Sequence, residues 1–411
     1  MGKKISLGNS LTLIIIAVAI TFSLTMVFAL RNFNEKVSSI TERENMFAKF
    51  TEIDNYVRSN QQQNLDENRL MDSVAKGYLS GINDPYALYM NAQEYAAYVT
   101  ASSETVAGVG VTTSLDSDGY MLVGKVYEGS TAASAGIQPG DLITKIDDIK
   151  VSPDTYDEAE ALLIGEAGTK VTLTIRRDSE DTEMEITRRI LTPSYISTTQ
   201  FGNIAYIRIE DFTESTPDQF SRAVENAISS GASALIFDIR SVSEGLVSSA
   251  ASVLDKLIGS GDLLFVKYRD GSDTLLYSSN SRETELPMSV LVNEATSGAA
   301  EFFAAGLKDY GKAKIVGTQT AGVGSLQKIF KLDDGSAIRL TIGEYYLAIS
   351  GESWEGKGIA PDHAVALTYT PDFTDVTLLD SSIDTQLAKA IEVISSSSNS
   401  ENAEENSENN G

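Results

Sequence analysis

The chain has 411 residues, of which 42% are hydrophobic, and a formal net charge of −26 with a pI near 4.4. This length predicts two or three domains, and the acidic balance argues against nucleic acid or anionic lipid as general partners, because phosphate binding needs clustered Lys and Arg. The absence of cysteine excludes disulfides and thiol chemistry, and a single histidine, His363, leaves no histidine cluster for zinc. We therefore expect no metal and no cofactor.

The N-terminus carries an apolar segment, Leu11 to Leu30, which contains 20 residues and no charge. At the rise of an α-helix this segment is about 30 Å long, the thickness of a bilayer core. Lys3 and Lys4 precede it, which predicts a single-pass membrane anchor with a cytoplasmic N-terminus and an extracytoplasmic remainder. The alternative is a cleaved signal peptide, although such peptides usually have a shorter apolar region and an A-x-A-like cleavage site.

The hydrophobic periodicity of the rest of the chain changes twice, which predicts a multidomain α/β protein. Apolar residues first recur at helical spacing, as in "MFAKFTEIDNYV", and short β-rich runs separated by Gly, Asp and Pro follow. Strand and helix patterns then alternate, and continuous apolar runs such as "ALIFDI" indicate strands of a largely parallel sheet that is covered on both faces. The expected parts are a stub and anchor (1–34), a helical segment (35–104), a small β domain (105–190), an α/β core (191–370), a C-terminal helical segment (371–393) and a disordered acidic tail (394–411).

Six segments, in this order, resemble those of a known peptidase family: "LSGINDPYALYM", "STAASAGIQPGDLITKIDDIKV", "IAYIRIEDFTEST", "ALIFDIR", "AAGLKDYGKAKIVG" and "GKGIAPD". The family is that of the carboxy-terminal processing peptidases, also called tail-specific proteases, and the resemblance extends roughly from Phe47 to Val365. It implies an exported or membrane-tethered serine protease with a PDZ domain and an α/β core. It also implies a Ser–Lys dyad in which the lysine is the general base and a glutamine supports it.

The positions of this dyad hold residues that cannot perform its chemistry. Where the family reads N-E-G-S-A-S-A-S-E, this chain reads "NEATSGAAE", so the nucleophile position falls on Gly298. Where the family reads T-F-G-K-G-S-V-Q, this chain reads "TAGVGSLQ", so the lysine position falls on Val323 and Gln327 is kept. A serine needs a base to remove its proton, and lysine serves as one when desolvation lowers its pKa. Neither partner is present at the expected positions.

The turn that helps to form the family's oxyanion hole is changed as well. The pattern D-L-R-N-N-P-G-G becomes "DIRSVSEG", in which Glu244 replaces the first glycine of the pair and Gly245 is kept. A carboxylate that faced the site would oppose a developing oxyanion.

Two nearby serines are fallback nucleophiles. Ser297 precedes the nucleophile position by one residue, and its simplest interpretation is a helix N-cap with Glu301 as additional negative charge. Ser325 lies between Val323 and Gln327, where a serine that hydrogen-bonds the backbone of a turn is the simplest interpretation.

The segment "TVAGVGV" resembles the loop and strand edge of a PDZ domain that receive a peptide C-terminus. The implied peptide-binding residues are Ala107, Gly108, Val109, Gly110 and Val111. Glycines allow backbone N–H groups to approach a carboxylate, and the strand edge can accept an added strand. The alternative is an ordinary β-turn of a small barrel.

The hypothesis that unites these features is a membrane-anchored pseudoprotease that binds protein or peptide C-termini. One alternative is an active serine endopeptidase that uses Ser297 or Ser325 with a rearranged base. Another is a structural ectodomain without a ligand. Oligomerisation stays open in each case.

Overall fold

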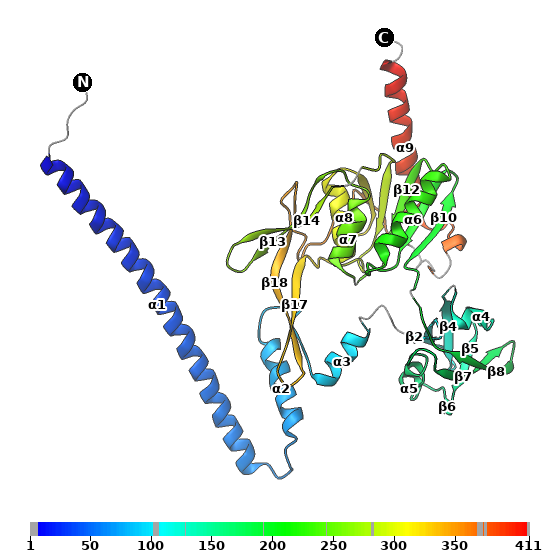
Figure 1. Cartoon of the computed structure of the whole chain (residues 1–411), viewed down its shortest axis with the longest axis horizontal. Coiled ribbons are helices and arrows are strands. Elements are labelled where there is room, and N and C mark those ends of the chain that lie inside the picture. The colour runs from blue at the N-terminus through cyan, green and yellow to red at the C-terminus, as the bar shows by residue number, and fades with distance from the viewer. Residues whose placement is uncertain are drawn as a thin grey trace. The chain divides into compact units, whose positions relative to one another are not determined.

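The computed structural model describes residues 7–101, 107–127, 129–191, 193–243, 245–280, 283–367, 373 and 376–408 (Figure 1). The chain divides into two compact units, Met1–Gly77 and Tyr78–Gly411.

The first unit is helical. It contains helix α1 (Leu7–Asn60), which runs without a break through the boundary expected at residue 34, and most of helix α2 (Glu67–Ser80). Arg58, near the end of α1, contacts Glu67 at the start of α2 at 2.6 Å and Asp54 at 2.8 Å. Across the described residues, none of the helices combines the length and the apolar character that crossing a bilayer requires.

A small β domain opens the second unit after strand β1 (Leu88–Met90) and helix α3 (Ala92–Ala101). One sheet has the order β3-β4-β5-β7-β8, with β6 beside β5, and β2 pairs separately with β9. The hairpin between β7 and β8 turns through Asp178 and Ser179, both with positive φ, as a tight two-residue hairpin requires. The strands and helices are β2 (Ala107–Gly108), β3 (Val111–Leu115), β4 (Met121–Val126), α4 (Thr131–Ser134), β5 (Leu142–Ile146), β6 (Ile149–Lys150), α5 (Tyr156–Ala161), β7 (Lys170–Arg177), β8 (Glu180–Thr187) and β9 (Arg189–Ile190).

The core domain contains the predicted parallel sheet, with strand order β10-β11-β12-β15-β16-β19. Only β10 runs antiparallel to its neighbour among these strands. The strands are β10 (Ile196–Phe201), β11 (Ile204–Ile209), β12 (Ala234–Asp238), β15 (Met288–Val292), β16 (Ala313–Gly317) and β19 (His363–Ala364). Every residue of β11, β12 and β15 is buried, which agrees with their continuous apolar sequences.

Helices cover both faces of this sheet. Alternate strand residues such as Ile207 and Phe237 share a core cluster with residues of α6 (Thr216–Ser229), α7 (Val247–Asp255) and α8 (Ala299–Asp309). The intervening residues, such as Tyr206 and Ile236, pack with α9 (Thr385–Glu408), which emerges at the C-terminal end in Figure 1.

A second, antiparallel sheet was not predicted by the sequence analysis. It has the order β1-β18-β13-β14, and β17 pairs with β18. Leu88 of β1 lies opposite Arg339 of β18, so the segment predicted to be helical contributes a strand to the core. The bounds are β13 (Gly261–Tyr268), β14 (Asp273–Ser279), β17 (Ser325–Lys331) and β18 (Ala337–Leu347).

Helix α9 extends into the segment 394–411, which the sequence analysis expects to be disordered. Helix α9 begins at Thr385 and continues to Glu408, and residues 409–411 lie outside the described residues. Ile394, the last apolar anchor before the serine-rich stretch, is 2% exposed and packs in the core cluster with Leu387. This burial ties the helix to the core at residue 394, where the expected tail begins.

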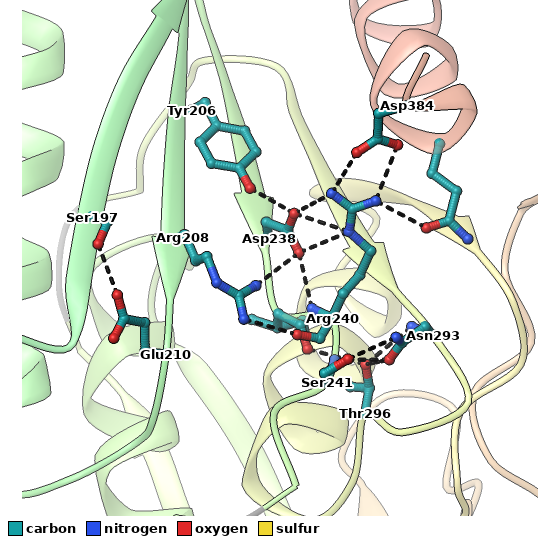
Figure 2. Close-up of polar contacts among 12 residues, drawn as sticks. Ser197, Tyr206, Arg208, Glu210, Asp238, Arg240, Ser241, Asn293, Thr296 and Asp384 are labelled. Carbon is teal, nitrogen blue, oxygen red and sulfur yellow. Dashed lines mark hydrogen bonds and ion pairs between the residues drawn. The ribbon is translucent and has the colours of Figure 1, made fainter. Parts of the chain in front are cut away.

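A buried ionic network fastens α9 to the sheet (Figure 2). The Arg240 guanidinium contacts Asp238 at 2.6 Å and Asp384, at the start of α9, at 2.9 Å, and all three side chains are fully buried. Burial by itself would raise the pKa of Asp238, but the charges of Arg240 and Arg208 outweigh it and hold the pKa below its ordinary value. Tyr206 adds a hydrogen bond to Asp238 at 2.6 Å.

We predict that Asp384→Ala lowers the free energy of unfolding of the core by about 3 kcal/mol, because it removes one partner from a buried charge network. The measurement is a urea titration followed by circular dichroism. Glu392→Gln is the matched control, since its exposed carboxylate contacts Lys389 on the same helix and should contribute less than about 1 kcal/mol. Equal effects of the two substitutions would contradict the prediction.

Candidate functional site

Two turns that carry the expected dyad positions meet on one buried carboxylate. The first turn follows β15 and ends at Gly298, and the second follows β16 and contains Val323. The backbone N–H of Gly298 donates to Oε2 of Glu301 at 3.0 Å, and the backbone N–H of Val323 donates to the same oxygen at 2.7 Å. The two nitrogens are therefore no farther apart than the sum of these distances. Both turns lie at the carboxyl ends of neighbouring parallel strands, where open α/β sheets place their sites.

The other oxygen of Glu301 holds the second turn in shape. Its Oε1 accepts hydrogen bonds from the Thr320 hydroxyl at 2.5 Å and from the Gly322 N–H at 2.7 Å. Burial raises the pKa of Glu301 above its ordinary value, although these donors oppose the shift. Three of the four donors are backbone groups, so the arrangement needs no particular side chain at positions 298 or 323.

The backbone at Gly298 has the conformation of a sharp elbow between a strand and a helix. Its φ of 60° and ψ of −117° lie in a region that residues with a side chain rarely adopt. A Cβ at this position would meet nothing within 4 Å. Similar elbows expose the nucleophile in other hydrolases, and a residue strained in this way costs on the order of 1–3 kcal/mol. The elbow therefore has room for a nucleophilic side chain at position 298, but glycine has no side chain to place there.

Val323 and Gln327 occupy the other family positions. Val323 is half-buried, and its carbonyl accepts a hydrogen bond from the Trp354 indole at 3.0 Å. Gln327 lies in β17 opposite Thr341, next to a β-bulge at Leu326. Among the described residues, no hydrogen bond joins the Gln327 side chain to Glu301. The site thus retains its backbone frame and contains no titratable group at the lysine position.

Neither fallback serine is arranged as a nucleophile. The Ser297 hydroxyl donates to the Ser243 carbonyl at 2.8 Å, and its side chain is not the helix N-cap that we expected, because Gly298 holds that position. Ser325 begins strand β17 rather than lying in a turn, and its hydroxyl is buried without a hydrogen-bond partner in the described part of the chain. Within the described ranges, neither hydroxyl has a hydrogen bond to a lysine or histidine.

The turn after β12 meets the same edge of the sheet. Ser241 donates its N–H to Oδ1 of Asn293 at 2.8 Å, and Asn293 returns a hydrogen bond to the Ser241 hydroxyl at 3.0 Å (Figure 2). Gly245 has a φ of 122°, and a Cβ there would lie 2.9 Å from Asp211 Oδ1. Glu244 lies outside the described residues, so the direction of its carboxylate stays a prediction.

Sequence reasoning missed two contributors to this site. Glu301 was assigned only a role in helix electrostatics, although it joins both turns. Tyr86, within the quoted segment "DPYALYM", directs its hydroxyl to the Gly322 carbonyl at 3.4 Å. Burial, together with the nearby Glu355 and Glu301, raises the pKa of Tyr86 to about 12. The segment that contains Tyr86 is one of the six family motifs, and this was the signal by which the sequence could have indicated a role for Tyr86.

A separate groove of about 470 Å³ lies between β3 and α5 of the small β domain. Its lining residues are Val111, Thr112, Thr113, Asp157, Glu160, Ala161, Leu163 and Ile164. Strand β3 is at the edge of its sheet, which leaves one side open to an added strand.

Of the five expected peptide-binding residues, only Val111 lines this groove. Ala107, Gly108 and Val109 are buried, and the Val109 N–H donates to the Leu163 carbonyl at 3.1 Å. Gly110 has a φ of 87°, and a Cβ there would lie 2.4 Å from the Ser130 Cβ, so the loop that leads into β3 requires glycine.

Comparison with known proteins identifies both domains. Residues 203–365, which include the turns around Glu301, match the model of peptidase family S41, and residues 122–177 match the model of the PDZ domain. The carboxy-terminal processing protease CtpA of Bacillus subtilis is 30% identical over 345 residues, which are 83% of this chain and 73% of that protein. The carboxy-terminal-processing protease of Bartonella bacilliformis is 31% identical over 82% of this chain and 79% of its own length.

Solved structures show the same architecture. The photosystem II D1 C-terminal processing protease has 26% sequence identity and a TM-score of 0.50, covering 80% of this chain and 89% of its own. A putative S41 protease from Bacteroides fragilis shares the fold at 19% identity, with a TM-score of 0.54 over 82% of this chain and 92% of its own. The relatives that establish the family are serine proteases that process carboxyl termini, and this chain belongs to their family, the carboxy-terminal processing peptidases of family S41, with a PDZ domain.

Proposed function

We propose that this chain is a pseudoprotease that has lost peptide hydrolysis and binds protein or peptide C-termini through its PDZ domain. The observation that carries the proposal is the shared contact of Gly298 and Val323 with Glu301. That contact brings the two turns that carry the expected nucleophile and base positions to one carboxylate, which supports the assignment of these turns to the site. Glycine has no nucleophile and valine no base, so an acyl-enzyme has no route of formation.

The displaced-serine alternative has less support. The Ser297 hydroxyl is engaged with a backbone carbonyl, and neither it nor Ser325 has a lysine or histidine as a hydrogen-bond partner among the described residues. A serine without a base keeps the low reactivity of an ordinary alcohol.

The groove between β3 and α5 supports the proposal that the PDZ domain binds peptides. It combines an open strand edge with an apolar end formed by Val111, Leu163 and Ile164. Strand addition with a pocket for a terminal side chain is the general mode by which PDZ domains capture peptides.

We further propose that Leu11 to Leu30 anchors the chain in a membrane and that the bulk of the chain is extracytoplasmic. The 20 uncharged residues after Lys3 and Lys4 support this location.

We predict no labelling of the purified protein by a fluorophosphonate probe, because neither serine of the described site is hydrogen-bonded to a base. The comparison variant carries Gly298→Ser and Val323→Lys, together with Glu244→Gly to free the oxyanion turn. This variant should gain labelling, although the strained φ at position 298 should lower its stability by about 1–3 kcal/mol. Labelling of the unchanged protein that Ser297→Ala or Ser325→Ala abolishes would support an active endopeptidase instead.

For the PDZ domain, we predict that a peptide with a free, apolar C-terminus binds in the micromolar range and that its C-terminal amide binds at least about fivefold more weakly. The physical reason is the loss of the carboxylate that backbone N–H groups would receive. Fluorescence anisotropy of labelled peptides measures both affinities. Equal affinities would exclude carboxylate recognition, and no binding by either peptide would favour a structural ectodomain.

For the anchor, we predict that the full chain sediments with membranes and resists extraction by high salt or alkaline carbonate. A chain that starts at Thr41 should stay in the supernatant, because it lacks the uncharged segment. Release of the full chain by carbonate would contradict a spanning anchor.

A further inference from the structure

The groove of the PDZ domain carries a polar cluster next to its apolar end. Oε1 of Glu160, on α5, accepts a hydrogen bond from the Thr113 hydroxyl of β3 at 2.7 Å and from the Tyr156 hydroxyl at 2.9 Å. The cluster therefore bridges the two walls of the groove. Both bonds go to Oε1, which leaves Oε2 without a partner among the described residues.

The register of an added strand places one peptide residue beside this cluster. A peptide whose carboxylate lies at the loop before Val111 must run antiparallel to β3, because it extends from that loop towards Leu115. If its last residue pairs with Val111, its third-from-last residue pairs with Thr113. Directly opposite residues of an antiparallel pair project to the same face of the sheet, and the Thr113 side chain points to α5.

The negative charge of the groove favours a basic side chain at the third-from-last position of the peptide. Asp157 and Glu160 are both among the lining residues, and the described lining contains no Lys, Arg or His. Glu160 is half-buried and Asp157 exposed, so a cation would meet one partly desolvated carboxylate and a second at the rim. An acidic peptide would be repelled there, in a chain that already carries a net charge of −26.

We infer that this PDZ groove selects C-terminal peptides with an apolar last residue and a Lys or Arg at the third-from-last position, and that Glu160 determines this selectivity. The inference rests on the proposed peptide-binding function and adds the class of ligand. The apolar last side chain would contact Val111, Leu163 and Ile164, while the cation would pair with Glu160.

The test uses the full-length protein and fluorescein-labelled peptides of the form Gly-Ser-Gly-Ser-X-Ala-Val with a free carboxylate. X is Lys, norleucine, Thr or Glu. Norleucine has a similar aliphatic stem without the charge, so the ratio of the Lys and norleucine affinities isolates the ion pair. We expect Lys to bind about fivefold more tightly than norleucine at about 50 mM NaCl, Glu to bind most weakly, and the Lys preference to shrink at about 500 mM NaCl.

Two variants with the same change of charge decide the role of Glu160. Glu160→Gln keeps an acceptor for Thr113 and Tyr156, and it should abolish the Lys preference while the norleucine peptide still binds. Glu158→Gln, on an exposed residue of the same helix that does not line the groove, should leave the preference unchanged. Thermal unfolding of each variant verifies that the domain remains folded.

Each other result overturns the inference in a recognisable way. Equal affinity for Lys and norleucine, together with weaker binding of the amides, would overturn the selectivity and keep the proposed peptide binding. Preferred binding of the Thr peptide would assign Glu160 to hydroxyl recognition instead. A Lys preference that Glu158→Gln removes as fully as Glu160→Gln would reflect the general field of the acidic chain. No binding by any peptide would overturn the proposed function as well.

Discussion

The site of this protein depends on one buried carboxylate, that of Glu301. It receives four hydrogen bonds from two turns that lie more than twenty residues apart in sequence, and so it joins the carboxyl ends of β15 and β16. An unpaired buried carboxylate is costly, which makes the four donors a condition for folding as well as a feature of the site. Because three donors are backbone N–H groups and the fourth is Thr320, the frame survives the replacement of both dyad side chains.

The backbone frame of the site is thus separate from the side chains at the expected dyad positions. The elbow at Gly298 still has the geometry that would present a side chain to open space, and Trp354 still holds the second turn through the Val323 carbonyl. Gly298 and Val323 contact Glu301 through backbone N–H groups alone, so these contacts do not depend on the side chains at the two positions.

The third turn depends on a different interaction. Asp238 and Arg240 lie at the end of β12 and are fully buried, and Asp384 brings the C-terminal helix to them. This network holds the segment that leads from β12 to Ser241, whose N–H donates to Asn293 after β15, and it neutralises charges that could not otherwise remain in the interior. The C-terminal helix is thus part of what positions the edge of the sheet, whereas the PDZ groove is built from its own strand and helix.

The sequence by itself determined the parallel sheet and the PDZ-like domain, and it predicted the register that places Gly298 and Val323 at the dyad positions. These features are local: apolar runs mark doubly covered strands, and motifs in order identify the family. Only the tertiary structure decided that Glu301 joins the two turns, that Ser297 turns towards Ser243, and that residues near 88 form a strand with residues near 339. It also decided that α9 continues beyond Ile394. Each of these depends on contacts between segments far apart in the chain, and such contacts leave no periodic trace in the residues that make them.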